Sequence, residues 1–456
     1  MRREWLVSLV VTLVTVALVL GAVRLIAPQL LGGPKDLGLV RLDRSVPSFY
    51  GTVFGDEGVL AAEVGDGYQL LDPVLQKRPK NFAADAGGWG PNDALGFRNP
   101  AVPLYAELIT LGDSQTYGNN AARAQNWPSV MRERLRATRP TLTHYDLSAG
   151  GWSAVQYLAM FRHARVLRPR IAVVAFYSGN DPLEAFQVAY GIDAWRDLRP
   201  DPALGEGDAP KVASPAPPSD QWQVAFRGGP STVFTPELRL SSNDRDNRAV
   251  DAGWRIMADV VRRIAAEAKS DGVSLAVTVI PTKELVYAGR VAAERLDAPP
   301  AYRRLVALEA RNIAELGEAV KAQGVRWIDV VAPLQSAASA TGMIYPDDLN
   351  GHPIPAGYRV IGEAIAMALV DAVATLPVAG LYAVMAPNHK DFRLFIANAE
   401  GLWLVEDDRL LERNGWDPKA RVPELDIKVA ATIPIAGTLT EVDPRRFGPQ
   451  SGRSTQ

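Results

Sequence analysis

A serine at position 114 stands where its hydroxyl could act as a nucleophile. It follows the apolar run 108–111 and the pair Gly112 and Asp113, and Gly118 lies four residues further on. The apolar run predicts a buried parallel strand, and Gly112 permits a sharp turn at its end. We expect Ser114 at the carboxyl edge of a sheet, where open α/β folds bind ligands. There its own backbone N–H would lie beside the hydroxyl, as acyl chemistry through serine requires.

Such a serine needs a general base, and histidine is the commonest one. Three of the four histidines begin a predicted strand, lie in a predicted helix or lie in a turn near the C-terminus. His352 differs, because the acids Asp347 and Asp348 precede it and a proline follows it. An acid near a histidine can accept its Nδ1 proton and fix its tautomer. The histidines of the chain are His144, His163, His352 and His389.

Four segments, taken in chain order, resemble the sequence blocks of the SGNH (GDSL-type) hydrolase superfamily. The resemblance covers about residues 92–375. It implies an α/β fold with a flavodoxin-like parallel sheet and helices on both faces, and an ester hydrolase or acyltransferase activity. The serine block, the glycine block, the Asn-Asp block and the Asp…His-Pro block lie at residues 108–118, 150–153, 178–181 and 347–353.

The resemblance assigns a catalytic role to each block. Ser114 is the nucleophile and His352 is the base. The oxyanion hole is formed by the backbone N–H groups of Ser114 and Gly151 and by the side chain of Asn180. One departure is Asp146, which takes the place of the asparagine that often starts the glycine block.

The acid that orients His352 does not stand at the position that is usual in the superfamily. The superfamily usually has an aspartate three residues before the histidine, and that position is Leu349 here. Asp348 stands four residues before His352 and Asp347 stands five before it. We predict Asp348 as the orienting acid, with Asp347 or a backbone carbonyl as the alternatives.

Composition and motifs exclude several other classes of function. The chain has 456 residues and a formal net charge of −2, which gives no electrostatic case for nucleic-acid binding. It has no cysteine, so disulfides, a thiol nucleophile and thiolate metal sites are excluded. No phosphate loop or dinucleotide glycine pattern occurs. His352 has no second histidine at metal-ligand spacing, so we expect neither a cofactor nor a metal.

The N-terminus predicts a membrane anchor within residues 1–26. Trp5 to Val23 are uncharged and mostly apolar, and as a helix they would span about 28 Å, close to the thickness of a bilayer core. Arg2 and Arg3 precede this run, so the N-terminus should stay in the cytoplasm and the rest should be exported. A cleaved signal peptide is the alternative, but no clear cleavage site follows the run.

The remainder of the chain divides into further predicted regions. Apolar runs predict strands at 108–112, 142–147, 171–177, 274–280 and 325–330. Helical patterns lie near 127–138, 153–168, 252–270, 301–323 and 355–373. This alternation predicts a parallel sheet. We therefore divide the chain into a linker and lead-in segment at 27–91, a catalytic domain at 92–375 with an irregular proline-rich insertion at 196–235, a small β-rich appendage at 376–446 and a disordered tail at 447–456.

One further segment bears on the subclass. Pro281, Lys283 and Tyr287 follow a predicted strand and resemble a Pro-x-Lys…Tyr segment of exported SGNH-like proteins tied to polysaccharide O-acetylation. The alternative is that these residues only end a core strand. The sequence leaves both interpretations open.

We therefore expect a membrane-anchored, extracytoplasmic enzyme. Ser114 would attack an ester, form an acyl-enzyme and pass the acyl group, with acetyl favoured, to water or to a hydroxyl of a carbohydrate. Its expected partners are an acylated carbohydrate and the lipid bilayer. A lipid or aryl esterase is one alternative, and a non-catalytic scaffold or assembly subunit with the same fold is another.

Overall fold

The computed structural model describes most of the chain between residues 69 and 448. The described residues are 41–43, 63–64, 69–85, 89–103, 106–140, 142–167, 169–213, 215–340, 342–374, 380–385, 392–398, 401–417, 421–425, 427–430 and 435–448. The predicted anchor at 5–23 and most of the linker lie outside these residues. Within them, no helix combines the length and the apolar character that crossing a bilayer requires.

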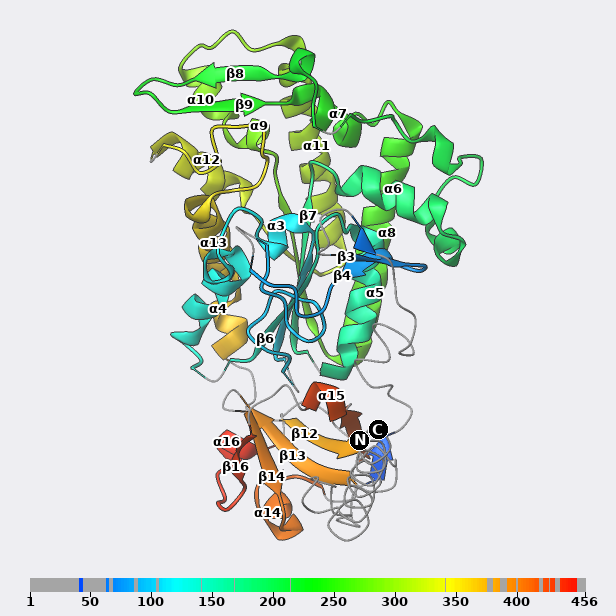
Figure 1. Ribbon diagram of the computed structural model, residues 1–456, viewed down its shortest axis with the longest axis vertical. Helices are drawn as coiled ribbons and strands as arrows, with labels where there is room; N and C mark the ends of the chain where they lie inside the picture. The colour runs from blue at the N-terminus through cyan, green and yellow to red at the C-terminus, as the bar shows by residue number, and fades with distance from the viewer. Residues whose placement is uncertain are drawn as a thin grey trace, which may run out of the picture.

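A five-stranded parallel sheet forms the centre of the fold (Figure 1). Its spatial order is β11-β10-β7-β5-β6, which is the flavodoxin-like order of a doubly wound sheet. The predicted parallel sheet is confirmed, and four of its five strands agree closely with the predicted ranges. The strands are β5 (Leu108–Gly112), β6 (His144–Ser148), β7 (Ile171–Tyr177), β10 (Ser274–Ile280) and β11 (Arg326–Ile328).

Strand β7 shows why this sheet needs helices on both faces. Ala172, Val174 and Phe176 belong to one buried apolar cluster, and the alternate residues of the strand, such as Val173, belong to the other. Because side chains alternate across a strand, these clusters are the two faces of the sheet. The first face packs against α5 (Ala154–Ala164) and α8 (Arg248–Asp271), and the second packs against α4 (Trp127–Arg136) and α13 (Pro355–Ala374).

Further helices connect the strands or follow their carboxyl ends. Only part of this set was predicted, because several members are short. The set comprises α3 (Ser114–Tyr117), α6 (Asp181–Gly191), α7 (Pro236–Asn243), α9 (Lys283–Val286), α10 (Ala288–Ala293), α11 (Pro300–Ala322), α12 (Val331–Ala340), and the short 3₁₀ turns η1 (Arg123–Gln125), η2 (Arg165–Leu167) and η3 (Asp193–Leu198).

The proline-rich insertion is more regular than predicted. Its prolines do accompany short 3₁₀ turns, η4 (Glu206–Asp208) and η5 (Pro218–Asp220). Its second half, however, forms an antiparallel hairpin of β8 (Trp222–Ala225) and β9 (Ser231–Phe234). The ring of Phe234 is buried beside those of Tyr287 and Tyr302. Burial of aromatic surface explains the order that the proline and glycine content concealed.

The C-terminal region is β-rich, as predicted, and it also contains short helices. It contains β12 (Gly380–Met385), β13 (Phe392–Asn398), β14 (Gly401–Val405), β15 (Arg421–Leu425), β16 (Ile435–Thr438), α14 (Asp408–Arg413), α15 (Ile427–Ala430) and α16 (Pro444–Phe447). Residues 427–430 are helical, although the composition of this region predicted a β-rich appendage. Phe447, which we assigned to the tail, is fully buried.

Two short N-terminal segments also join sheets. The strand β1 (Arg41–Asp43) pairs in parallel with β15 and so extends the C-terminal sheet at its edge. The strands β2 (Glu63–Val64), β3 (Gln69–Asp72) and β4 (Gln76–Pro79) form a separate three-stranded antiparallel sheet. The lead-in segment is therefore divided between two sheets, which composition did not reveal. The domain boundaries given above stay predictions.

Candidate active site

Ser114 begins a short helix at the carboxyl end of the central strand β5. Asp113 is the N-cap of α3, and its side chain accepts a hydrogen bond from the backbone N–H of Gln115. A Cβ at Gly112 would lie 1.9 Å from Oγ1 of Thr116. Only glycine therefore allows the chain to turn this tightly between strand and helix. The turn places Ser114 at the predicted edge of the sheet.

The hydroxyl of Ser114 meets the ring of His352 directly. Oγ of Ser114 lies 2.7 Å from Nε2 of His352, although the two residues are 238 positions apart in the chain. A weaker contact of 3.2 Å joins the same hydroxyl to Oδ2 of Asp113. The nucleophile and base predicted from the sequence are thus within hydrogen-bonding distance of each other.

Asn350 holds the other side of the His352 ring. Its Oδ1 lies 2.7 Å from Nδ1 and also accepts the backbone N–H of His352 at 3.0 Å. A backbone N–H can only donate, so the atom it contacts is the amide oxygen and not the amide nitrogen. Nδ1 must then carry the proton, which leaves Nε2 free to accept the proton of Ser114. Asn350 therefore selects the tautomer that a base in this position needs.

The predicted orienting acid is elsewhere in the loop. Oδ1 of Asp348 accepts the backbone N–H of Asn350 at 2.8 Å, and in the described structure no hydrogen bond joins Asp348 or Asp347 to His352. The prediction of Asp348 as the partner of His352 is corrected to Asn350. The cause is local: Asp348 and Asn350 each bond the backbone two residues on, forming two successive turns. These turns use the carboxylate of Asp348 and bring the amide of Asn350 to the ring.

Lys283 fixes the backbone of this loop. Its ammonium donates to the carbonyl oxygens of Asp348 at 2.7 Å and Asn350 at 3.2 Å. The side chain is buried, and burial lowers the pKa of Lys283 to about 8. The Pro-Thr-Lys segment therefore has a direct structural role here, because Lys283 positions the loop that carries Asn350 and His352.

The predicted oxyanion residues lie in the loops after the neighbouring strands. Gly151 has a φ of +64°, which favours glycine. Asn180 precedes α6 and its Oδ1 is buried with no hydrogen-bond partner in the described structure. Its backbone carbonyl accepts the backbone N–H of Glu184 at 2.9 Å, and a Cβ at Gly151 would lie 3.7 Å from Oε1 of Glu184. Gly151 and Asn180 are therefore close to each other, and their role as oxyanion donors stays a prediction.

Burial controls the ionisation of the groups around Ser114. It raises the pKa of Asp113 to about 7 and raises that of Asp181, with the nearby carboxylates adding to both effects. Asp181 accepts hydrogen bonds from the hydroxyl of Tyr157 and the backbone N–H of Tyr177, at 2.9 and 3.0 Å. These two hydrogen bonds fix Asp181, the residue that follows Asn180, to α5 and to the end of β7.

His352 is held in its neutral form. Burial, together with the positive charge of Arg239, lowers the pKa of His352 to about 3. The guanidinium of Arg239 donates to the carbonyl of Gly179 at 3.4 Å and lies over the ring of Tyr177. Neutral imidazole is the form that can accept a proton. Among the residues that the structure describes, no carboxylate is hydrogen-bonded to its ring to stabilise the charged form.

The other histidines have structural surroundings. His144 is at the start of β6, where its Nε2 lies 3.0 Å from Oγ1 of Thr110. His163 lies on α5 and is half-buried, and His389 is outside the described residues. Among the residues that the structure describes, no group of histidines and acids has the arrangement of a metal site.

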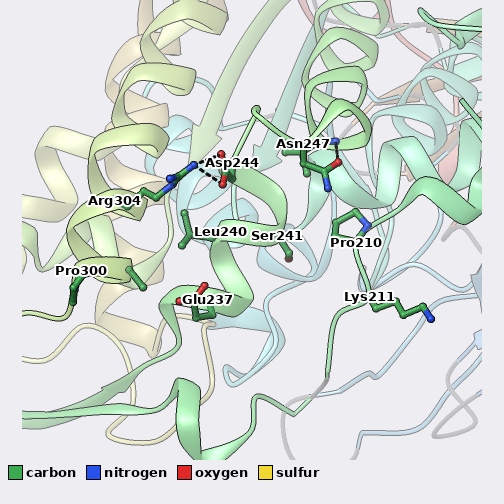
Figure 2. A pocket seen from close by; sticks show the side chains of 11 residues that line it. Pro210, Lys211, Glu237, Leu240, Ser241, Asp244, Asn247, Pro300 and Arg304 are labelled. Carbon is green, nitrogen blue, oxygen red and sulfur yellow. Dashed lines mark hydrogen bonds and ion pairs between the residues drawn. The ribbon is translucent and has the colours of Figure 1, made fainter. Parts of the chain in front are cut away.

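A separate pocket of about 560 Å³ lies against α7 (Figure 2). Figure 2 shows Asp244 paired with Arg304 on its wall, at 2.8 Å. It is lined by Pro210, Lys211, Glu237, Leu240, Ser241, Asp244, Asn247, Val250, Pro300, Ala301 and Arg304. None of these residues belongs to the four sequence blocks. Arg239 lies on the same helix but contacts Gly179, so α7 separates the pocket from the Asn180 loop.

Comparisons with known proteins give structural matches only. No family model matches the chain and no curated protein matches it. A solved structure named TesA is 15% identical, with 57% of this chain and 97% of that chain covered and a TM-score of 0.32. A GDSL-like lipase from Bacteroides thetaiotaomicron is 14% identical, covering 58% of this chain and 88% of that chain, with a TM-score of 0.30.

An acetyl xylan esterase from Geobacillus stearothermophilus also matches. It is 11% identical, with 59% of this chain and 96% of that chain covered and a TM-score of 0.33. One of these three structures is named as a GDSL-like lipase, and each is only a protein to which this chain is similar. The relation to polysaccharide O-acetyltransferases stays a prediction.

Proposed function

We propose that this protein is a serine-dependent ester hydrolase or acyltransferase that works through an acyl-enzyme on Ser114. One observation carries the proposal: the continuous hydrogen-bonded chain from Ser114 to His352 to Asn350. A nucleophile joined to a base, and a base joined to an orienting group, is the arrangement that acyl transfer through serine requires. A scaffold protein would have no need to keep it.

The steps follow from the positions of these groups. His352 accepts the proton of Ser114 at Nε2 as Oγ attacks the ester carbonyl. The N–H of Ser114, the N–H of Gly151 and the side chain of Asn180 stabilise the oxyanion. His352 then gives the proton to the leaving alcohol, and the acyl group remains on Oγ. An incoming hydroxyl, from water or a sugar, reverses these steps and releases the acyl group.

Acetyl esters of carbohydrate are the substrates that we propose, with a lipid or aryl ester as the alternative. The support is the resemblance of the sequence blocks and of the Pro-x-Lys…Tyr segment to exported members of the superfamily. Hydrolysis and transfer use the same site and differ in whether water reaches the acyl-enzyme.

An acceptor experiment separates these two outcomes. The full-length protein in detergent is incubated with an activated acetyl ester, with and without an oligosaccharide, and the sugar is weighed by mass spectrometry. Acetylated sugar that depends on Ser114 supports transfer. Acetate release with the sugar unchanged across several acceptors supports hydrolysis, and no acetate release on any ester contradicts the proposal.

We also propose that residues 1–26 anchor the enzyme with its catalytic domain outside the cytoplasm. The long uncharged run after Arg2 and Arg3 supports this topology. A reporter that is active only in the cytoplasm, fused after Gln456, is expected to be silent in membranes that contain the protein. A strongly active reporter would contradict the topology.

A further inference from the structure

The N-terminal hairpin β3–β4 is joined by side-chain hydrogen bonds to the glycine block, to α5 and to η3. In each of these hydrogen bonds a side-chain N–H donates to a backbone carbonyl group. The position of the hairpin is therefore fixed by directional bonds and not only by apolar contact. The bonds are Gln69 Nε2 to Gly150 O at 2.6 Å, Trp152 Nε1 to Lys77 O at 2.7 Å, Gln156 Nε2 to Leu75 O at 3.0 Å and Trp195 Nε1 to Val74 O at 2.8 Å. The hairpin is thereby fixed beside the glycine block.

The side chain of Lys77 projects from this hairpin onto Gly151. A Cβ added to Gly151 would lie 2.1 Å from Nζ of Lys77 and 2.9 Å from its Cε. The ammonium therefore occupies the space that a side chain at Gly151 would fill. Gly151 is the residue whose N–H is assigned to the oxyanion hole, so a positive charge stands beside that donor.

Glu184 creates the need for this charge. Its backbone N–H donates to the carbonyl of Asn180, the other predicted oxyanion donor, and its Oε1 lies 3.7 Å from the position of the same Cβ. Burial raises the pKa of Glu184, and the charge of Lys77 opposes that rise. An ionised carboxylate next to a forming oxyanion would repel it strongly in a site with little water. A cation at Gly151 offsets this repulsion.

We propose that the ammonium of Lys77 is a further component of the oxyanion site, supplied by the N-terminal hairpin. This inference rests on the proposed acyl-enzyme function of Ser114. The ammonium neutralises Glu184 and attracts the negative charge that develops on the carbonyl oxygen. It acts on the transition state more than on the neutral ester, so its effect belongs to kcat and not to KM.

The test compares charge variants in the full-length protein with a neutral activated acetyl ester. Lys77→Met is expected to lower kcat by about 10²-fold, in the range for loss of one oxyanion donor, with KM changed little. Lys77→Arg should retain more activity than Lys77→Met. Arg78→Met is the matched control, because successive residues of a strand point to opposite faces, and it should keep wild-type kcat.

Chemical rescue distinguishes charge from structure. Ethylammonium added to Lys77→Ala should restore part of kcat, which a purely structural role of Lys77 would not allow. Lys77→Met turnover equal to or faster than wild type would overturn the inference while leaving the function of Ser114 intact. A wild-type protein with no Ser114-dependent turnover would overturn the proposed function and this inference together.

Discussion

Ser114→Ala is expected to reduce turnover of a small acetyl ester by at least about 10³-fold, because removing the nucleophile leaves only binding and oxyanion stabilisation. His352→Ala should cause a similar loss, since the two side chains act as one unit at 2.7 Å. The double variant should be no worse than either single variant. Initial rates at saturating substrate are the measurement.

Folding must be preserved for this result to be informative. The N-cap of α3 is Asp113 and the turn depends on Gly112, so the Ser114→Ala variant keeps the local backbone. Ser241→Ala is the matched control, because Ser241 lies on α7 and lines the separate pocket. The thermal unfolding midpoints of the wild type, Ser114→Ala and Ser241→Ala should agree. Substantial turnover by folded Ser114→Ala would show that another group attacks the ester.

The pH dependence of Asn350→Asp is the second large effect that we expect. His352 must be unprotonated to act as the base, so activity rises with pH through its pKa. Burial and Arg239 lower the pKa of His352 to about 3. The fall of kcat/KM at acid pH, the acid limb of the pH profile, should therefore lie below pH 5 in the wild type. A carboxylate in place of Oδ1, which lies 2.7 Å from Nδ1, would stabilise the charged ring and raise that pKa by about 1–3 units. The acid limb of kcat/KM should move toward neutral pH by the same amount.

Two controls define the effect of Asn350. Asn120→Asp adds the same charge one contact further from the ring, because Oδ1 of Asn120 accepts from Nδ2 of Asn350 at 2.9 Å. It should shift the limb by less. Asn350→Leu removes the acceptor and should lower kcat at pH 8 by about 10²-fold or more, since nothing then fixes the tautomer. Equal profiles for wild type and Asn350→Asp would contradict the assignment of Asn350.

Asp113 does not disturb this comparison. Burial raises its pKa to about 7, so it titrates within the measured range. Its side chain is hydrogen-bonded to Ser114 and Gln115 and not to Asn350, so its titration is expected in both profiles. The difference between the two profiles therefore reports His352.

The sequence predicted the parts of the fold that depend on local pattern. β7 was found because it is apolar without alternation, as a strand buried on both faces must be. Ser114 and His352 were found because each has a distinctive neighbourhood, Gly112 before one and an acidic pair before the other. These features are short-range, so one sequence is sufficient to recognise them.

What the sequence did not predict depends on contacts between distant segments. Asn350, and not the predicted Asp348, contacts the ring of His352, because two successive turns and the ammonium of Lys283 set the path of the loop. The hairpin β8–β9 is ordered because Phe234 packs against the rings of Tyr287 and Tyr302, which are distant in the chain. Lys77 could not be predicted as a site residue, because nothing in its own neighbourhood indicates that its ammonium reaches Gly151, 74 positions away. The signal for each was absent from the local pattern.

A covalent probe tests the central claim most directly. The full-length protein is treated with a serine-directed fluorophosphonate at neutral pH, digested and analysed by mass spectrometry. We expect one added phosphonyl group, located on Ser114, and no labelling of Ser114→Ala. Labelling should be much slower in His352→Ala, because the base that activates the hydroxyl is absent. An unlabelled wild-type protein, or a label on another residue, would contradict the assignment of Ser114 as the nucleophile.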